Sequence, residues 1–130
     1  MTYSKRFSSR FFTKLLQPAG TNPVRDRATS FSLIFELLDQ KVEKDFLIVE
    51  TGCMRKDHGQ LAFGDDGAST YIFDDFINYY DGEVHSVDIK KENVDYANEL
   101  TSKKTTVHCQ DSVDFLWNLP KKQIDFLYLD

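Results

Sequence analysis

Apolar positions along the chain follow two different spacings, and each spacing predicts a different element. From Asp45 onward, short continuous apolar runs alternate with segments in which apolar residues recur every three or four positions. The short runs are typical of buried strands, and the longer spacing is typical of helices. The strand-like runs are residues 46–50 (FLIVE), 83–89 (EVHSVDI), 105–109 (TTVHC) and 124–130 (IDFLYLD).

Helix-like segments connect these runs. The first covers residues 72–80 and stops at Asp81-Gly82, and the second covers residues 91–104. A third, short helix begins at Asp111 or Ser112 and ends before Pro120. The apolar positions of the three helices are Ile72, Phe73, Phe76, Ile77 and Tyr80, then Val94, Ala97 and Leu100, then Val113, Leu116 and Trp117. The alternation predicts an α/β fold with right-handed crossovers and a parallel sheet covered by helices on both faces.

Residues 1–44 have a different pattern and are predicted to form an N-terminal helical segment that precedes the domain over 45–130. The first acidic residue is Asp26, whereas basic side chains occur throughout the segment before it. Apolar residues four positions apart predict a stripe on a basic helix. Mitochondrial presequences and membrane-surface helices share this pattern, but we favour a helix that packs on its own domain. A break at residues 17–23 (QPAGTNP) precedes a second helix.

Length and composition limit the class of protein. The chain has 130 residues, of which 41% are hydrophobic and 28% charged, and this predicts one globular unit with a single core. A net charge of -5 argues against a general affinity for nucleic acid. No apolar run is long enough to span a membrane. Two cysteines are too few for a disulfide framework and predict a reducing, cytoplasmic location.

Every predicted strand has a carboxylate at or just after its carboxyl end. These are Glu50, with Gly52 two residues later, then Asp88, Asp111 and Asp130. A single acidic residue after a strand is common because Asp caps helices and occupies turns. Four at one edge of a sheet would repel each other unless a ligand, a cation or protons intervened. The pattern therefore predicts a site whose partner carries hydroxyls, amines or a positive charge.

In the order of their predicted strands along the chain and the acidic residues at the strand ends, residues 45–130 resemble the class I S-adenosylmethionine-dependent methyltransferases, which have a Rossmann-like sheet. In that family the first strand ends in an acidic residue followed by glycine, and VETG at residues 49–52 is similar. The resemblance implies that Glu50 lies near the methionine part of the cofactor. Gly52 would let the backbone approach the ligand.

The resemblance extends to the later strands. HSVDI at residues 85–89 implies that Asp88 accepts from both ribose hydroxyls and that Ile89 lies against the adenine. HCQDS at residues 108–112 implies that Asp111 and Ser112 lie beside the adenine amino group. Asp130 would then face the region of methyl transfer, as the candidate catalytic residue.

The chain also departs from the family. Its glycines after the first strand are spread along a loop, which resembles the branch with a longer loop before the first helix. DDGAST at residues 65–70 would then supply backbone donors, with Ser69 or Thr70 adding a hydroxyl at the start of the helix. The alternative is an ordinary solvated loop with Ser69 as a helix cap. Family members continue past the fourth strand. We therefore expect a fragment, a truncated gene product, or a subunit whose sheet is completed by a second copy or a partner.

The resemblance implies methyl transfer from S-adenosylmethionine to a small-molecule or saccharide acceptor. The alternative is a non-catalytic or truncated module that binds S-adenosylmethionine or a nucleotide and works only in an assembly. A nicotinamide site is less favoured because the GxGxxG fingerprint is absent, and we expect no complete metal site. Of the three histidines only His58 is placed to act as an acid or base, and we favour a polar loop residue there.

Overall fold

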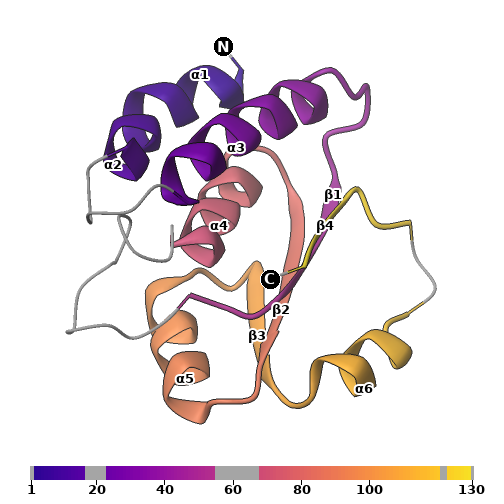
Figure 1. Ribbon diagram of the computed structural model, residues 1–130. Helices are drawn as coiled ribbons and strands as arrows, with labels where there is room; N and C mark the ends of the chain where they lie inside the picture. Colours follow the sequence, from indigo (N-terminus) through magenta and orange to yellow (C-terminus); the bar gives the residue numbers. More distant parts are fainter. Residues whose placement is uncertain (1, 17–22, 55–67, 121–122, 130) are drawn as a thin grey trace.

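A four-stranded parallel sheet forms the centre of the protein (Figure 1). The computed structural model describes residues 2–16, 23–54, 68–120 and 123–129. Its strands are β1 (Phe46–Thr51), β2 (Gly82–Asp88), β3 (Thr105–Cys109) and β4 (Phe126–Leu129), in the order β3-β2-β1-β4. All neighbouring pairs run parallel. The predicted α/β class is confirmed, and the arrangement corresponds to half of a Rossmann-like fold.

Helices cover both faces of this sheet. α4 (Ser69–Tyr79) links β1 to β2, and α5 (Lys91–Leu100) links β2 to β3. Both connections move in the same direction across the sheet, so right-handed crossovers place both helices on one face. α6 (Ser112–Trp117) leads back from β3 to β4 and covers the other face, where Phe115 packs with Val49 and Val87.

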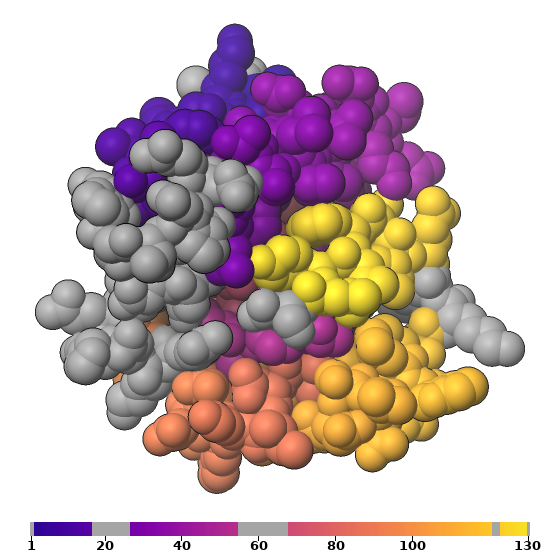
Figure 2. Space-filling model, viewed as in Figure 1, coloured from indigo at the N-terminus to yellow at the C-terminus, as the bar shows by residue number. Residues whose placement is uncertain are grey.

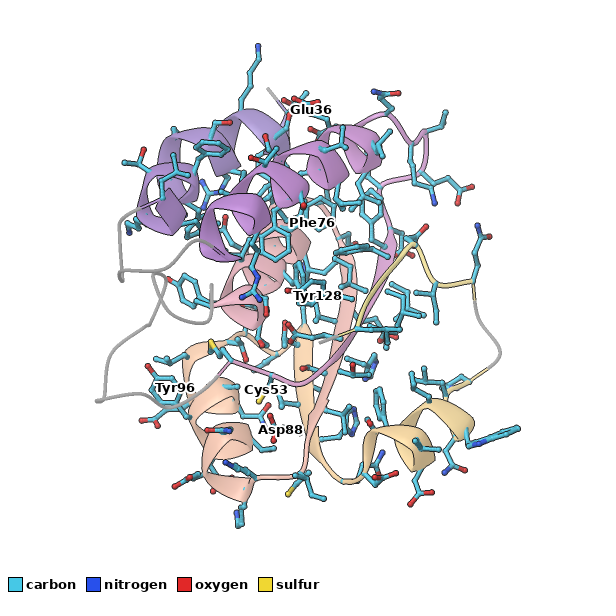
Figure 3. All side chains as sticks on the ribbon, in the orientation of Figure 1. Glu36, Cys53, Phe76, Asp88, Tyr96 and Tyr128 are labelled. Carbon is cyan, nitrogen blue, oxygen red and sulfur yellow. The ribbon has the colours of Figure 1, made fainter. Side chains whose placement is uncertain are left out.

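The N-terminal helices share their core with the sheet. They are α1 (Tyr3–Phe7), the π-helical η1 (Ser8–Phe12), α2 (Thr13–Leu16) and α3 (Pro23–Asp39), at the top of Figure 1. Their buried aromatic residues belong to the same cluster as those of β1 and α4. The ring centroids of Tyr3 and Phe46 lie 5.0 and 4.9 Å from that of Phe76, which Figure 3 labels. Such pairs each add about 0.5–1.5 kcal/mol beyond their buried area. The favoured interpretation, a helix packed on its own domain, is confirmed.

Polar contacts fix α1 to its neighbours. The Asp75 carboxylate of α4 accepts from Arg6 at 2.8 Å, from Arg10 at 3.1 Å and from the Tyr3 hydroxyl at 3.0 Å. Asp39, at the end of α3, accepts from the backbone N–H groups of Tyr3 and Ser4, each at 2.9 Å. The first turn of α1 is thus held from two sides.

Gly82 allows β1 and β2 to approach closely where β2 begins. Its φ is +119°, and a Cβ atom there would lie 1.9 Å from the carbonyl oxygen of Phe46. Any side chain would therefore collide with the neighbouring strand. The sequence predicted that the preceding helix stops at Asp81-Gly82, and the structure adds this steric requirement.

Two helices differ from their predicted extent. α5 ends at Leu100, four residues before the predicted end, and Thr101 already has an extended backbone. α6 ends at Trp117, and its buried residue is Phe115, whereas Trp117 is 83% exposed. Because α6 is short and begins beside the sheet, only Phe115 turns toward it.

β4 lies on the surface beneath α3 (Figure 2), with Leu127 and Leu129 partly exposed on the α6 side. Within the described ranges, no helix has the length and apolar character needed to cross a membrane.

Candidate functional site

The strand order reverses between β1 and β4. From β1 the chain moves outward to β2 and β3, whereas β4 lies on the other side of β1. In open α/β sheets, ligands bind beyond the carboxyl ends of the strands near such a reversal. Gly52 follows β1, Asp88 ends β2 and Asp111 follows β3, so these candidates lie along the same edge of the sheet.

Glu50 is fully buried at this edge and is held by hydroxyl groups. Its carboxyl group accepts from Ser69, from Thr70 at 2.6 Å and from Ser86 at 2.7 Å. Ser69 and Thr70 begin α4, whereas Ser86 comes from β2. A buried carboxyl group needs such partners because water is excluded. Glu50 thus joins β1, β2 and the start of α4 in one hydrogen-bonded cluster, which we call the Glu50 cluster.

The Glu50 cluster also fixes the chain that follows β1. The Thr70 hydroxyl, which donates to Glu50, accepts from the backbone N–H of Met54 at 2.9 Å. Gly52 has a φ of +80°, in the region that favours glycine, and its N–H donates to the Val87 carbonyl at 2.7 Å. The chain just after β1 therefore turns over the end of β2 and is anchored to α4.

Asp88 is half-buried at the end of β2. Its Oδ1 accepts from the Lys90 N–H at 2.9 Å, and its Oδ2 accepts from the Cys53 thiol at 3.7 Å (Figure 3). Burial, together with the nearby carboxylates of Asp88 and Glu50, raises the pKa of the Cys53 thiol well above its usual range. The thiol therefore stays protonated and remains a donor. Each carboxylate oxygen of Asp88 retains capacity for another hydrogen bond.

The side chains beyond β2 and β3 are more exposed. Ile89 is 72% exposed, and its carbonyl accepts from the Cys109 thiol at 3.7 Å. Asp111 caps α6, since its Oδ2 accepts from the N–H groups of Val113 at 3.0 Å and Asp114 at 3.2 Å. This confirms the predicted cap. Ser112 is the first residue of α6 and is half-buried.

Of the remaining candidate residues, the structure describes Ser69 but not Asp130. Ser69 is not the cap of α4, because Ala68 takes that position with a φ of +46° and the Ser69 hydroxyl donates to Glu50 instead. The interpretation of Ser69 as a helix cap is therefore wrong. Asp130, His58 and residues 65–67 of the predicted loop lie outside the described residues.

Sequence reasoning missed two partners in this site. Ser86 is a serine inside an apolar strand, on the same face as Val84, and a buried hydroxyl at such a position signals a polar partner. Cys53 follows Gly52 directly and donates to Asp88. Ser86 and Cys53 are each noticeable in the local sequence, but the carboxylates to which they donate belong to other segments of the chain, Glu50 of β1 and Asp88 of β2. The sequence alone therefore did not identify these contacts.

A pocket lies at the opposite, amino edge of the sheet. This pocket of about 430 Å³ is lined by four carboxylates, Asp45, Asp81, Glu83 and Asp125, with Phe46, Leu47, Gly82 and Gln123. Asp125 pairs with Lys41, and Asp81 pairs with Lys104 at 3.1 Å. Since at least two of its carboxylates already have cationic partners, the pocket makes a weaker ligand site than the carboxyl edge. No group of three acidic, histidine or cysteine side chains suited to a metal ion occurs among the residues that the structure describes.

Comparisons with known proteins add no family assignment. No family model matches the chain, and no curated protein shows significant sequence similarity to it. The function is therefore inferred from the geometry of the carboxyl edge.

Proposed function

We propose that the carboxyl edge of the sheet binds S-adenosylmethionine and that the protein acts in methyl transfer from this cofactor. The observation that carries the proposal is the position of Asp88, a half-buried carboxylate at the end of β2, beside β1, which contains Glu50 and is followed by Gly52. A carboxylate with two acceptor oxygens suits a vicinal diol such as the ribose 2′- and 3′-hydroxyls. The Lys90 N–H and the Cys53 thiol orient Asp88 for this role.

The adenine would lie between the ends of β2 and β3. Ile89 offers an exposed apolar surface for a flat ring, and burying it there would remove apolar area from water. Asp111 uses Oδ2 to cap α6, so its other oxygen is available to an exocyclic amine. Ser112 adds a hydroxyl next to it. The donor and acceptor set along this edge therefore fits an adenosine group.

The amino-acid end of the cofactor would lie over Gly52. A positive φ and the lack of a side chain allow the ligand to approach the backbone there. The resemblance implies that Glu50 lies near this part of the cofactor; its oxygens accept from three hydroxyls, and it is fully buried. In this proposal Glu50 holds Ser69, Thr70 and the chain after β1 in place, and so shapes this end of the site.

Bound S-adenosylmethionine supplies a methyl group on a positively charged sulfur, which a nucleophilic acceptor atom attacks directly. The residues of this chain contribute by holding the cofactor in one orientation, which lowers the entropic cost of the reaction. We propose a small-molecule or saccharide acceptor and, because both cysteines are free, a reducing compartment such as the cytoplasm. Asp130 stays the proposed residue nearest the acceptor.

A second candidate is a module that binds the cofactor without catalysis and works in an assembly. It is favoured by β4, an edge strand of the described sheet with Leu127 and Leu129 partly exposed. Such an edge accepts another strand from a second copy or a partner. Transfer of a labelled methyl group to any acceptor in a substrate screen would separate the two candidates.

Calorimetric titration with S-adenosylmethionine, S-adenosylhomocysteine and NAD tests the proposal. We expect binding of the first two, and at least a hundredfold loss in Asp88→Ala, because two hydrogen bonds to a charged acceptor contribute about 1.5–3 kcal/mol each. Asp95→Ala is the matched control, since Asp95 pairs with Lys91 on the surface of α5. NAD binding stronger than that of S-adenosylmethionine, or equal affinity in Asp88→Ala, would overturn the proposal.

A further inference from the structure

Two histidines form a pair beneath α6, away from the proposed cofactor contacts. His85 on β2 and His108 on β3 lie on the face of the sheet that α6 covers, with His85 Nδ1 and His108 Nε2 3.1 Å apart. The ring centroids are 5.3 Å apart, and the ring planes differ by 21°. This hydrogen bond needs one nitrogen with a proton and one without. The pair in this geometry therefore holds at most three of the four protons that two imidazolium rings carry.

The two ends of the pair have different surroundings. At the His85 end, the Glu83 carboxylate lies 3.5 Å from His85 Nε2, and the His85 side chain is 26% exposed. At the His108 end, the Phe115 ring of α6 packs 5.1 Å from the His108 ring. One added proton leaves the hydrogen bond intact, because the pair then holds three protons. A second proton would break the hydrogen bond and place like charges side by side.

Within the part of the chain that the structure describes, Glu83 is the charged group that could compensate a second proton on the pair. β1 contributes the apolar Leu47 and Val49 to this face, and the connection after α6 contributes Leu119 and Ile124 near His85. The carboxylates of α6 are Asp111 and Asp114, which are both exposed, and Asp111 is engaged as the helix cap. β3 has no charged side chain other than His108. Among the described residues, Glu83 is therefore the facing counter-charge, and it lies at the His85 end.

We propose that the His85–His108 pair is a proton-sensitive latch, which keeps α6 docked on the sheet at neutral pH and releases it in mildly acidic solution. The hydrogen bond requires that at least one of the two rings stays neutral, and the packing of His108 against Phe115 disfavours a charge on its ring because it excludes water. Undocking relieves the repulsion, because the two rings then become free to separate into water. The event that controls docking is uptake of the second proton.

The consequence for function rests on the proposed cofactor site. α6 begins at Ser112 and is capped by Asp111, and these are two of the residues proposed to contact the adenine. His108 precedes them by only three positions along the chain. Release of α6 would therefore displace the adenine contacts and weaken cofactor binding as the pH falls. Asp88 lies on the opposite face of β2 and would be unaffected.

The direction of the pH dependence follows from the environment of His108. Burial and the nearby His85 lower the pKa of His108 below its usual value. The docked state therefore binds fewer protons than the undocked state, and docking is lost as the pH falls below about 6.5, the pKa of a free histidine. For one proton, the docking equilibrium changes by up to about tenfold per pH unit in this window.

Amide exchange and imidazole NMR on the chain without cofactor test the latch itself. We expect the protection of the Phe115 and Asn118 amides, both hydrogen-bonded within α6, to fall by up to about tenfold per unit below pH 6.5. His108→Gln, which accepts a hydrogen bond but does not titrate, should remove this dependence, and His58→Gln should keep it. His85→Gln serves as a second variant. Unchanged protection between pH 8 and 5, or the same decline in both latch variants, would overturn the proposal.

Titration with S-adenosylhomocysteine at pH 7.5 and 5.5 tests the coupling separately. We expect weaker binding at the lower pH in the wild type and a smaller change in His108→Gln. Equal affinity at both pH values, in a protein whose α6 amides lose protection, would refute the coupling. No binding at pH 7.5 would refute the proposed cofactor site and with it the coupling. The amide data would then decide the latch alone.

Discussion

Ser86→Ala is a sensitive test of the Glu50 cluster because it removes one oxygen atom and little else. Ser86 is fully buried, and its hydroxyl donates to Glu50 at 2.7 Å. The substitution takes one of three hydroxyl donors from a carboxyl group that water does not reach. A hydrogen bond to a charged acceptor contributes about 1.5–3 kcal/mol, so we expect a loss of about 2 kcal/mol in the free energy of unfolding.

Urea unfolding followed by circular dichroism measures this loss. With a slope of about 1.5 kcal/mol per molar, the midpoint should shift by roughly 1.3 M with the slope unchanged. The matched control is Ser30→Ala, an exposed serine of α3, which should stay within about 0.5 kcal/mol. A Ser86→Ala midpoint equal to that of the control would refute the reasoning, because it would mean that Glu50 does not depend on its hydroxyl partners.

Three further predictions concern stability and reactivity. Cys109 is exposed and should react with a thiol reagent at pH 8, whereas Cys53 should react only after unfolding because its thiol is buried and has a raised pKa. Mass spectrometry of the labelled peptides distinguishes the two cysteines, and equal reaction rates would contradict the structure. Gly82→Ala should destabilise the protein by at least about 3 kcal/mol in urea unfolding, since its Cβ would collide with Phe46, and a loss below about 1 kcal/mol would show that the strands separate easily. Burial alone would raise the pKa of Asp39, but hydrogen bonds from Tyr80, Ser4 and Tyr3 lower it below the usual value. The stability that Asp39 contributes is therefore present above about pH 3.8 and is lost as the pH falls through the lower pKa that Asp39 has in the folded protein. The acid-induced loss of stability should be smaller in Asp39→Asn.

Much of the fold could be predicted because local patterns determine it. The run at 46–50 and the apolar spacing over 72–80 became β1 and α4, since a buried strand and an amphipathic helix each leave a direct mark on the sequence. The extent of α6 was less predictable. Its apolar residues suggested a core face that includes Trp117, but the anchor at Asp111 turns Phe115 toward the sheet.

The site was predictable only in outline. The position of Asp88 follows from the strand pattern, because the carboxyl ends of parallel strands meet at one edge. The partners of Glu50 do not follow from it, since Ser86 and Thr70 reach the same carboxyl group from separate elements. The pairing of His85 with His108 likewise depends on the register of β2 against β3, which no local pattern specifies.

The central claim is that the carboxyl edge of the sheet holds an adenosine-containing cofactor. An amide NMR titration with S-adenosylhomocysteine locates the ligand most directly. We predict shifts concentrated at residues 52–54, 88–90 and 109–112, with little change at the amino-edge pocket around Asp45 and Asp125. Shifts centred on the amino edge, or none at millimolar ligand, would contradict the account.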